Sequence, residues 1–122
     1  MVLDTNILIN ATKPGGEQLR SWLDDPAALV SIVSRIEALG YTGISAEEEA
    51  ALEGALQSLP EAGLTEDVVI RAIALRRERK MGLADAIIAA TALVHDVSLV
   101  TRNVDDFKHI TGLKLINPFE AS

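Results

Sequence analysis

The chain opens with a short apolar run that passes directly into polar residues, Met1-Val2-Leu3-Asp4-Thr5-Asn6. A short apolar run bounded in this way is typical of a buried β-strand, and Asp4 would stand at its carboxyl end. Apolar residues resume after Asn6, which indicates a helix over residues 7–12. In open parallel α/β sheets, ligands bind at the carboxyl ends of the strands. Asp4 is therefore the first candidate for a functional site.

On the C-terminal side of this stretch, predicted strands alternate with predicted helices. Apolar runs predict strands at residues 27–32, 98–101 and 113–116, and a brief strand within residues 60–64. Helical spacing and capping residues predict helices at residues 17–23, 34–40, 46–59, 65–80 and 83–95, and a short helix after the turn that starts at residue 102. This alternation predicts an α/β fold in which helices cover both faces of a parallel sheet.

The apolar spacing of two of these helices predicts which side chains they bury. In the helix at residues 46–59 the predicted core residues are Ala50, Leu52, Ala55, Leu56 and Leu59. In the helix at residues 65–80 they are Val68, Ile70, Ala72, Ile73 and Leu75. The helix at residues 83–95 is apolar on almost every side, which predicts a buried, central position.

Length and composition predict a single folded domain over residues 1–122, with a core of aliphatic residues. The chain contains no cysteine, which excludes disulfides, thiol catalysis and zinc–thiolate sites, and we expect a cytoplasmic protein. We expect neither a membrane span nor a signal peptide. The net charge of −7 argues against nucleic-acid binding by bulk electrostatics. It remains compatible with a nuclease whose metal-binding carboxylates contribute to that charge, and with a basic protein partner.

Three acidic residues have both a structural and a functional interpretation. Asp4 suits a helix N-cap as well as it suits a ligand site. Glu37 would complete a capping box with Ser34, although it also lies near the carboxyl end of the second strand. Asp85 stands in the first turn of an apolar helix, where the helix dipole favours it, but no basic residue lies one turn away. A carboxylate buried without a partner is costly, so Asp85 points to a ligand role.

The segment after the fourth strand supplies further polar candidates. A polar turn that caps the next helix is the favoured interpretation for Asp105, whereas Asn103 and Asp106 could reach the same edge as the other acids. The two histidines, His95 and His109, show no metal-ligand spacing, and we expect them to be surface residues or hydrogen-bonded ones. The basic run at residues 76–80 predicts a solvated helix end, with contact to a phosphate backbone as the minor alternative.

All three main acids are expected at one edge of the sheet, and that convergence indicates a metal site. Several oxygen ligands without cysteine or a histidine pair suit a hard cation such as Mg²⁺ or Mn²⁺. Such an ion polarises a phosphodiester and generates a nucleophilic hydroxide, which is the chemistry of metal-dependent nucleases.

These residues, taken in order, resemble the PIN-domain ribonucleases, and among them the VapC toxins of toxin–antitoxin pairs. The resemblance starts with Asp4-Thr5-Asn6 after the first strand and a serine followed by Glu37 after the second. It continues along the whole chain through Ala84-Asp85-x-x-Ile88-Ala89-Ala90-x-Ala92, Leu99-Val100-Thr101-Arg102-Asn103-x-x-Asp106-Phe107 and Leu113-x-x-Ile116-Asn117-Pro118.

The resemblance implies a central parallel sheet with strand order 3-2-1-4-5 and Mg²⁺- or Mn²⁺-dependent cleavage of RNA by an endoribonuclease toxin. It also implies a cognate antitoxin protein that blocks the site, and a homodimer or a toxin–antitoxin hetero-oligomer. By position, Asp4, Glu37 and Asp85 match the catalytic, metal-binding acids. The supporting polar residues are Thr5, Asn6, Thr101, Asn103 and Asp106. Many relatives carry a fourth acid where this chain has Asn103, so the sequence leaves open whether one or two ions bind.

Three rival functions compete with the nuclease. A PIN-like scaffold that has lost catalysis and binds only a partner is kept open by Asn103. A receiver-like signalling domain would need an acidic pair after the first strand and a late lysine, neither of which is present. A metal-dependent phosphatase would favour Asp-x-Asp where this chain has Asp4-x-Asn6.

Overall fold

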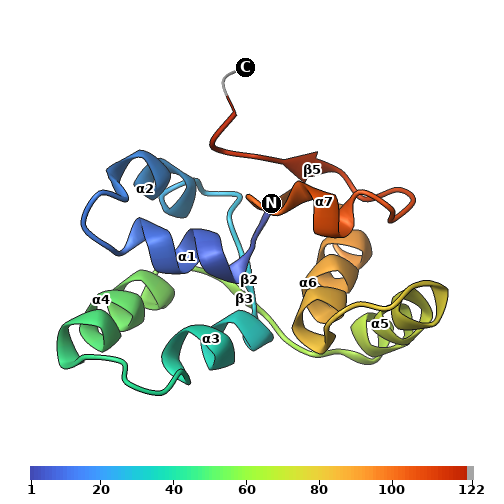
Figure 1. The fold of residues 1–122 in the computed structure, drawn as a ribbon, viewed down its shortest axis with the longest axis horizontal. Coiled ribbons are helices and arrows are strands. Elements are labelled where there is room, and N and C mark those ends of the chain that lie inside the picture. Colours follow the sequence, from blue (N-terminus) through green and yellow to red (C-terminus); the bar gives the residue numbers. More distant parts are fainter. Residues whose placement is uncertain (121–122) are drawn as a thin grey trace.

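The computed structural model describes residues 1–120, so the last two residues of the predicted domain lie outside the described part. Its strands and helices are all short (Figure 1). The strands are β1 (Val2–Leu3), β2 (Val30–Ser31), β3 (Glu61–Ala62), β4 (Leu99–Val100) and β5 (Leu115–Ile116). The helices are α1 (Thr5–Ala11), α2 (Glu17–Leu23), α3 (Ile32–Leu39), α4 (Ala46–Gln57), α5 (Glu66–Glu78), α6 (Leu83–Val94) and α7 (Val104–Phe107). Across residues 1–120, none of these helices has the length and apolar character that crossing a membrane requires.

The strands are parallel and form two hydrogen-bonded groups. β1, β4 and β5 make one group, and β2 and β3 make the other. A single parallel bridge between Val2 and Leu29 joins the two groups, and the Leu3 N–H donates to the Leu29 carbonyl at 2.9 Å. With that bridge, the strand order is 3-2-1-4-5, as the family resemblance implies. The predicted second strand at residues 27–32 is shortened because α3 already begins at Ile32.

Successive residues of β1 and β4 point to opposite faces of the sheet, and each face has its own apolar core. Val2 and Leu99 pack with α5 and α6, whereas Leu3 and Val100 pack with α1 and α4. Figure 1 shows α1 to α4 on one side of the strands and α5 to α7 on the other. The predicted α/β fold with helices on both faces is therefore confirmed.

The helix starts correct two predictions. Helix α1 begins at Thr5 rather than Ile7, with Asp4 as its N-cap. The predicted capping box of Ser34 and Glu37 is wrong, because Ser31 caps α3 by accepting a hydrogen bond from the Val33 N–H at 3.1 Å. Ser34 therefore lies inside the helix, and Glu37 is free to serve elsewhere.

The predicted core of α5 is wrong at two positions. Val68, Ala72 and Leu75 are buried, but Ile70 is 57% exposed and Ile73 is 48% exposed. The helix buries one narrow stripe against α6, with spacing i, i+4 and i+7, and the neighbouring apolar stripe faces outward. Ala50 of α4 is likewise exposed rather than buried.

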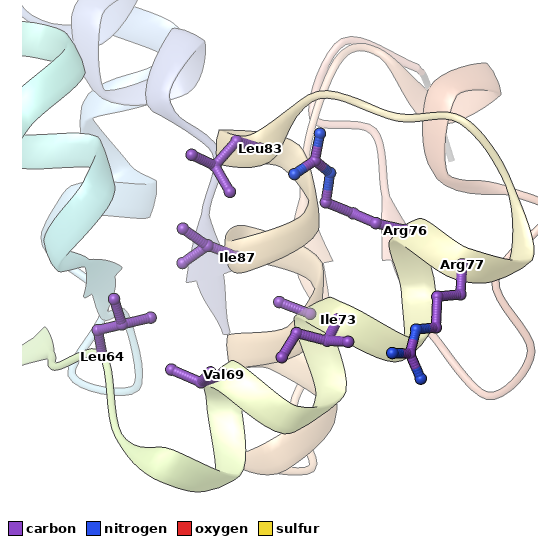
Figure 2. A pocket seen from close by; sticks show the side chains of 8 residues that line it. Leu64, Val69, Ile73, Arg76, Arg77, Leu83 and Ile87 are labelled. Atoms are coloured by element: carbon purple, nitrogen blue, oxygen red, sulfur yellow. The ribbon is translucent and has the colours of Figure 1, made fainter.

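The outward stripe of α5 borders a cavity of about 350 Å³ between α5 and α6 (Figure 2). Its lining is apolar with two arginines at the rim: Leu64, Val69, Ala72, Ile73, Arg76, Arg77, Leu83 and Ile87. The Arg76 guanidinium donates to the Met81 carbonyl at 3.3 Å and so ties α5 to the loop that follows it. No acidic residue lines this cavity, so it is separate from the acid cluster described next.

Candidate active site

Asp4 connects the first strand to the first helix and is held by three hydrogen bonds. Its backbone N–H continues the sheet by donating to the Val100 carbonyl at 2.9 Å. Its Oδ1 accepts from the Thr5 N–H and its Oδ2 accepts from the Thr101 hydroxyl, both at 2.8 Å. Its side chain is only 5% exposed. Asp4 is thus both a helix cap and a fixed carboxylate, so its two proposed roles do not exclude each other.

Thr5 joins α1 to α3 through a chain of hydroxyl groups. The Thr5 hydroxyl donates to Glu37 Oε1 at 2.6 Å and lies 2.8 Å from the Ser34 hydroxyl. With the Thr5 proton directed to Glu37, the Ser34 hydroxyl is left to donate to Thr5. Ser34 is fully buried and holds this pair in place. Ser34 and Glu37 are three residues apart, and this spacing puts both side chains on one face of α3.

Asp85 reaches the same region from α6, on the other side of the sheet. It lies in the first turn of that helix and is partly buried. Burial raises the pKa of its carboxyl group above the ordinary value of 3.8, and the charges of Asp4, Asp106 and Glu37 raise it further. The three ion pairs formed within residues 1–120 involve other acids, so no lysine or arginine forms an ion pair with Asp85.

The pKa of Asp4 responds to the same neighbours. Burial raises it, the hydrogen bonds from Thr101 and Thr5 lower it, and the charges of Glu37 and Asp106 raise it again. The overall direction is upward. Four carboxyl groups from separate elements therefore share one electrostatic environment, in which each disfavours the ionisation of Asp4 or Asp85.

The acids open into a polar cavity of about 450 Å³. Six residues of its lining were predicted as site residues: Asp4, Thr5, Asn6, Glu37, Asp85 and Asn103. Four were not predicted: Ile9, Asn10, Lys13 and Tyr41. Thr101 is fully buried behind Asp4, and Asp106 acts on the cluster through its charge without lining the cavity. Lys13 and Tyr41 lie in connecting segments, where no periodicity indicates which way a side chain points.

The donor set suits a hard divalent cation. Its side-chain donors are carboxylate, amide and hydroxyl oxygens, which Mg²⁺ and Mn²⁺ prefer. Among residues 1–120, no three acidic or histidine side chains are close enough together to enclose an ion by themselves. Mg²⁺ commonly takes one or two protein carboxylates and keeps several waters, so two of these acids with water would satisfy it.

The other predicted polar residues lie outside this cavity. Asp105 does not cap α7, because Asn103 occupies the cap position and Asp105 pairs with Lys108 at 3.1 Å. His95 is exposed, as predicted. The prediction for His109 is wrong: both ring nitrogens are buried and have no hydrogen-bond partner within residues 1–120. The basic residues 76–80 are exposed, which agrees with a solvated helix end.

Comparison with known proteins agrees with this fold. A curated relative, "Ribonuclease VapC1" of Rickettsia felis, is 53% identical over 36 residues, which cover 30% of this chain and 27% of that protein. A chain of a toxin–antitoxin complex from Klebsiella pneumoniae is 32% identical, with 98% of each chain covered and a TM-score of 0.79. A chain of DNA-bound VapBC from Salmonella typhimurium shares the fold, with 24% identity, 96% of each chain covered and a TM-score of 0.83.

The family match extends over almost the whole chain. It covers residues 1–113 and includes every element that contributes to the acid cavity. This match favours a PIN fold over the receiver-like domain that was considered from the sequence. The chain belongs to the PIN domain family.

Proposed function

We propose that this chain is an endoribonuclease that uses Mg²⁺ or Mn²⁺ and acts as the toxin of a VapC-type toxin–antitoxin module. The observation that carries the proposal is the convergence of Asp4, Glu37 and Asp85 from three elements on one cavity, with no cationic side chain paired to any of them. Asp4 is buried, Asp85 is partly buried and Glu37 is exposed, and the like charges of the three acids disfavour their ionisation unless a cation is present. A divalent ion would relieve this repulsion.

The residues of the chain have distinct tasks in such a reaction. Asp4, Asp85 and Glu37 would hold the ion and its water molecules. A bound divalent ion supplies Lewis-acid polarisation of the phosphodiester and a more acidic water. Thr101 and Thr5 fix the carboxylates of Asp4 and Glu37 by hydrogen bonding, so that they need little rearrangement when the ion binds.

The toxin assignment rests on the relatives. One similar solved chain is described as part of a toxin–antitoxin complex, and the short curated match is described as a ribonuclease. An antitoxin that neutralises this chain would be encoded beside it. Co-expression with the product of a small neighbouring reading frame should restore the growth of cells that this chain inhibits.

The direct test is RNA hydrolysis by purified protein with Mn²⁺ and with EDTA. We expect cleavage only with the metal, and loss of cleavage in Asp4→Asn and Asp85→Asn, while circular dichroism shows a retained fold. Asp105→Asn is the matched control, because Asp105 is exposed and paired with Lys108 outside the cavity. If Asp85→Asn cut RNA as fast as the wild type, this mechanism would be wrong.

The rival function is a catalytically inactive PIN scaffold that binds only a protein partner. Asn103 favours it, because an uncharged amide stands in the cavity at the position where the family resemblance leads us to expect a fourth acid. Calorimetric titration separates the two functions. An inactive scaffold should bind Mn²⁺ poorly, whereas the nuclease should bind it through the acid cluster.

A further inference from the structure

Lys13 is the one cationic residue among those that line the acid cavity. It follows α1, the helix that Asp4 caps, and its side chain is exposed. Lys13 also lines a neighbouring cavity together with Glu47 and Glu48 at the start of α4, and its charge contributes to lowering the pKa of Glu48. The three ion pairs within residues 1–120 do not include it, so its charge is available to a ligand.

The turn that carries Lys13 is tightly constrained. Gly16 donates its N–H to the Lys13 carbonyl at 3.0 Å. A Cβ atom on Gly16 would lie 1.9 Å from the Asn10 carbonyl oxygen, so only glycine permits this close return of the chain. Gly15 has a φ of +88°, in the left-handed region. The backbone therefore holds Lys13 at the mouth of the cavity.

Tyr41 lines the same cavity from the segment between α3 and α4. Tyr41 is 38% exposed, whereas Phe107 is buried and Trp22 and Phe119 are partly buried. Its hydroxyl donates to Glu48, in the first turn of α4, and this bond orients the ring. An exposed aromatic ring is thus fixed beside the carboxylates.

We infer, on the basis of the proposed nuclease function, that Lys13 and Tyr41 bind the RNA strand beside the reacting phosphate. Lys13 would contact a backbone phosphate, and Tyr41 would stack on the base of an unpaired nucleotide. Because the chain has a net charge of −7, it must attract the phosphates of RNA through local positive charge. Lys13 supplies a positive charge in the cavity itself. A base can stack on an aromatic side chain only when it has left a duplex, so the substrate segment is single-stranded.

The arginine-rich end of α5 does not serve this cavity. Arg76 and Arg77 line the apolar cavity between α5 and α6 instead, and Arg76 is engaged with the Met81 carbonyl. This separates the role of Lys13 from that of the larger basic run.

Steady-state cleavage of a short, unstructured RNA tests Lys13. Lys13→Ala should raise KM about tenfold, as expected for the loss of a charge-assisted bond, with little change in kcat. It should also reduce the slope of log KM against log salt by about 1. Lys13→Arg should restore most of the KM. Lys114→Ala removes the same charge at the amino end of β5, away from the carboxyl ends of the strands where the cavity lies, and should leave KM unchanged.

Two variants separate the ring of Tyr41 from its hydroxyl. Tyr41→Ala should raise KM for unpaired RNA by roughly 5- to 100-fold, because it removes the stacking surface. Tyr41→Phe keeps the ring but loses the bond to Glu48 that orients it, so its KM should rise much less than that of Tyr41→Ala. Equal losses in both variants, or equal cleavage of unpaired RNA and of a duplex of the same sequence, would overturn the stacking role.

A binding measurement distinguishes failure of this inference from failure of the nuclease function. Fluorescence anisotropy of the same labelled RNA is measured on Asp85→Asn protein with either lysine replaced. If the wild type cuts no RNA but Lys13→Ala weakens binding and Lys114→Ala does not, the RNA-binding role of Lys13 stands and the nuclease function is wrong. If the wild type cuts RNA and the two lysine variants have the same KM, the role of Lys13 is wrong.

Discussion

Replacing Thr101 with valine should destabilise the protein by removing the two hydrogen bonds that its hydroxyl makes beside the acid cluster. Thr101 is fully buried, and its hydroxyl makes two hydrogen bonds. It donates to Asp4 Oδ2 at 2.8 Å and accepts from the Asn103 N–H at 3.0 Å. Valine keeps the shape of the side chain but removes both bonds.

The size of the loss follows from these contacts. A hydrogen bond to a charged group contributes about 1.5–3 kcal/mol, and the Asn103 N–H left without its partner costs about 1 kcal/mol more. The extra buried methyl group of valine returns about 0.8 kcal/mol. We expect the free energy of unfolding at pH 7 to fall by about 2–3 kcal/mol.

The loss should depend on pH in a defined direction. The bond from Thr101 lowers the pKa of Asp4, so it is strongest when that carboxyl group is ionised. The stabilisation is therefore present at neutral pH and weakens as the pH falls through the pKa of Asp4. Valine and wild type should differ less in acid than at pH 7.

Urea unfolding in EDTA measures this difference, and Thr101→Ser is the matched control. Serine keeps the hydroxyl and loses one buried methyl group, which costs about 1 kcal/mol. The expected order of stability at pH 7 is wild type, then serine, then valine. A valine variant as stable as the serine variant would refute the reasoning.

Three further predictions concern stability. In metal-free protein, Asp85→Asn should raise the thermal midpoint at pH 7, because the pKa of Asp85 is raised in the folded state and its ionised form therefore destabilises the fold. The gain should vanish below about pH 3.8, where the carboxyl group is protonated in both the folded and the unfolded state. Ser45→Ala should lower the free energy of unfolding by about 1 kcal/mol in urea, since Ser45 forms a complete capping box at the start of α4; an unchanged midpoint would contradict this. Ile73→Gln should change stability by no more than about 0.5 kcal/mol, whereas Val68→Ala, on the buried stripe of α5, should cost roughly 2 kcal/mol, and similar losses in the two would argue against the observed burial.

The convergence of the acids was predictable because it follows from topology. Parallel strands bring their carboxyl ends to one edge, so residues after β1 and β2 must approach one another. Helix α6 leads through a short turn into β4 and runs antiparallel to it, so its first turn, which carries Asp85, lies at the same edge. The sheet itself was less predictable, since strands of two residues leave a weak pattern and the second one was predicted too long.

Local choices between equivalent patterns were not predictable. Serines at positions 31 and 34 both suit an N-cap, and the structure shows that Ser31 caps α3, whereas Ser34 lies within the helix and hydrogen-bonds to Thr5. Two adjacent apolar stripes of α5 look equally suitable for burial, and the position of α6 decides between them. The orientation of Lys13 and Tyr41 depends on how connecting segments return to the cavity, which no periodic signal records.

Calorimetric titration of Mn²⁺ into metal-free protein at neutral pH tests the central claim most directly. The wild type and Asp105→Asn should bind the ion with the same affinity, and Asp4→Asn should bind it at least tenfold more weakly, because a charged ligand of the buried cluster has been removed. Equal affinity in all three proteins would contradict the assignment of Asp4 to the metal site.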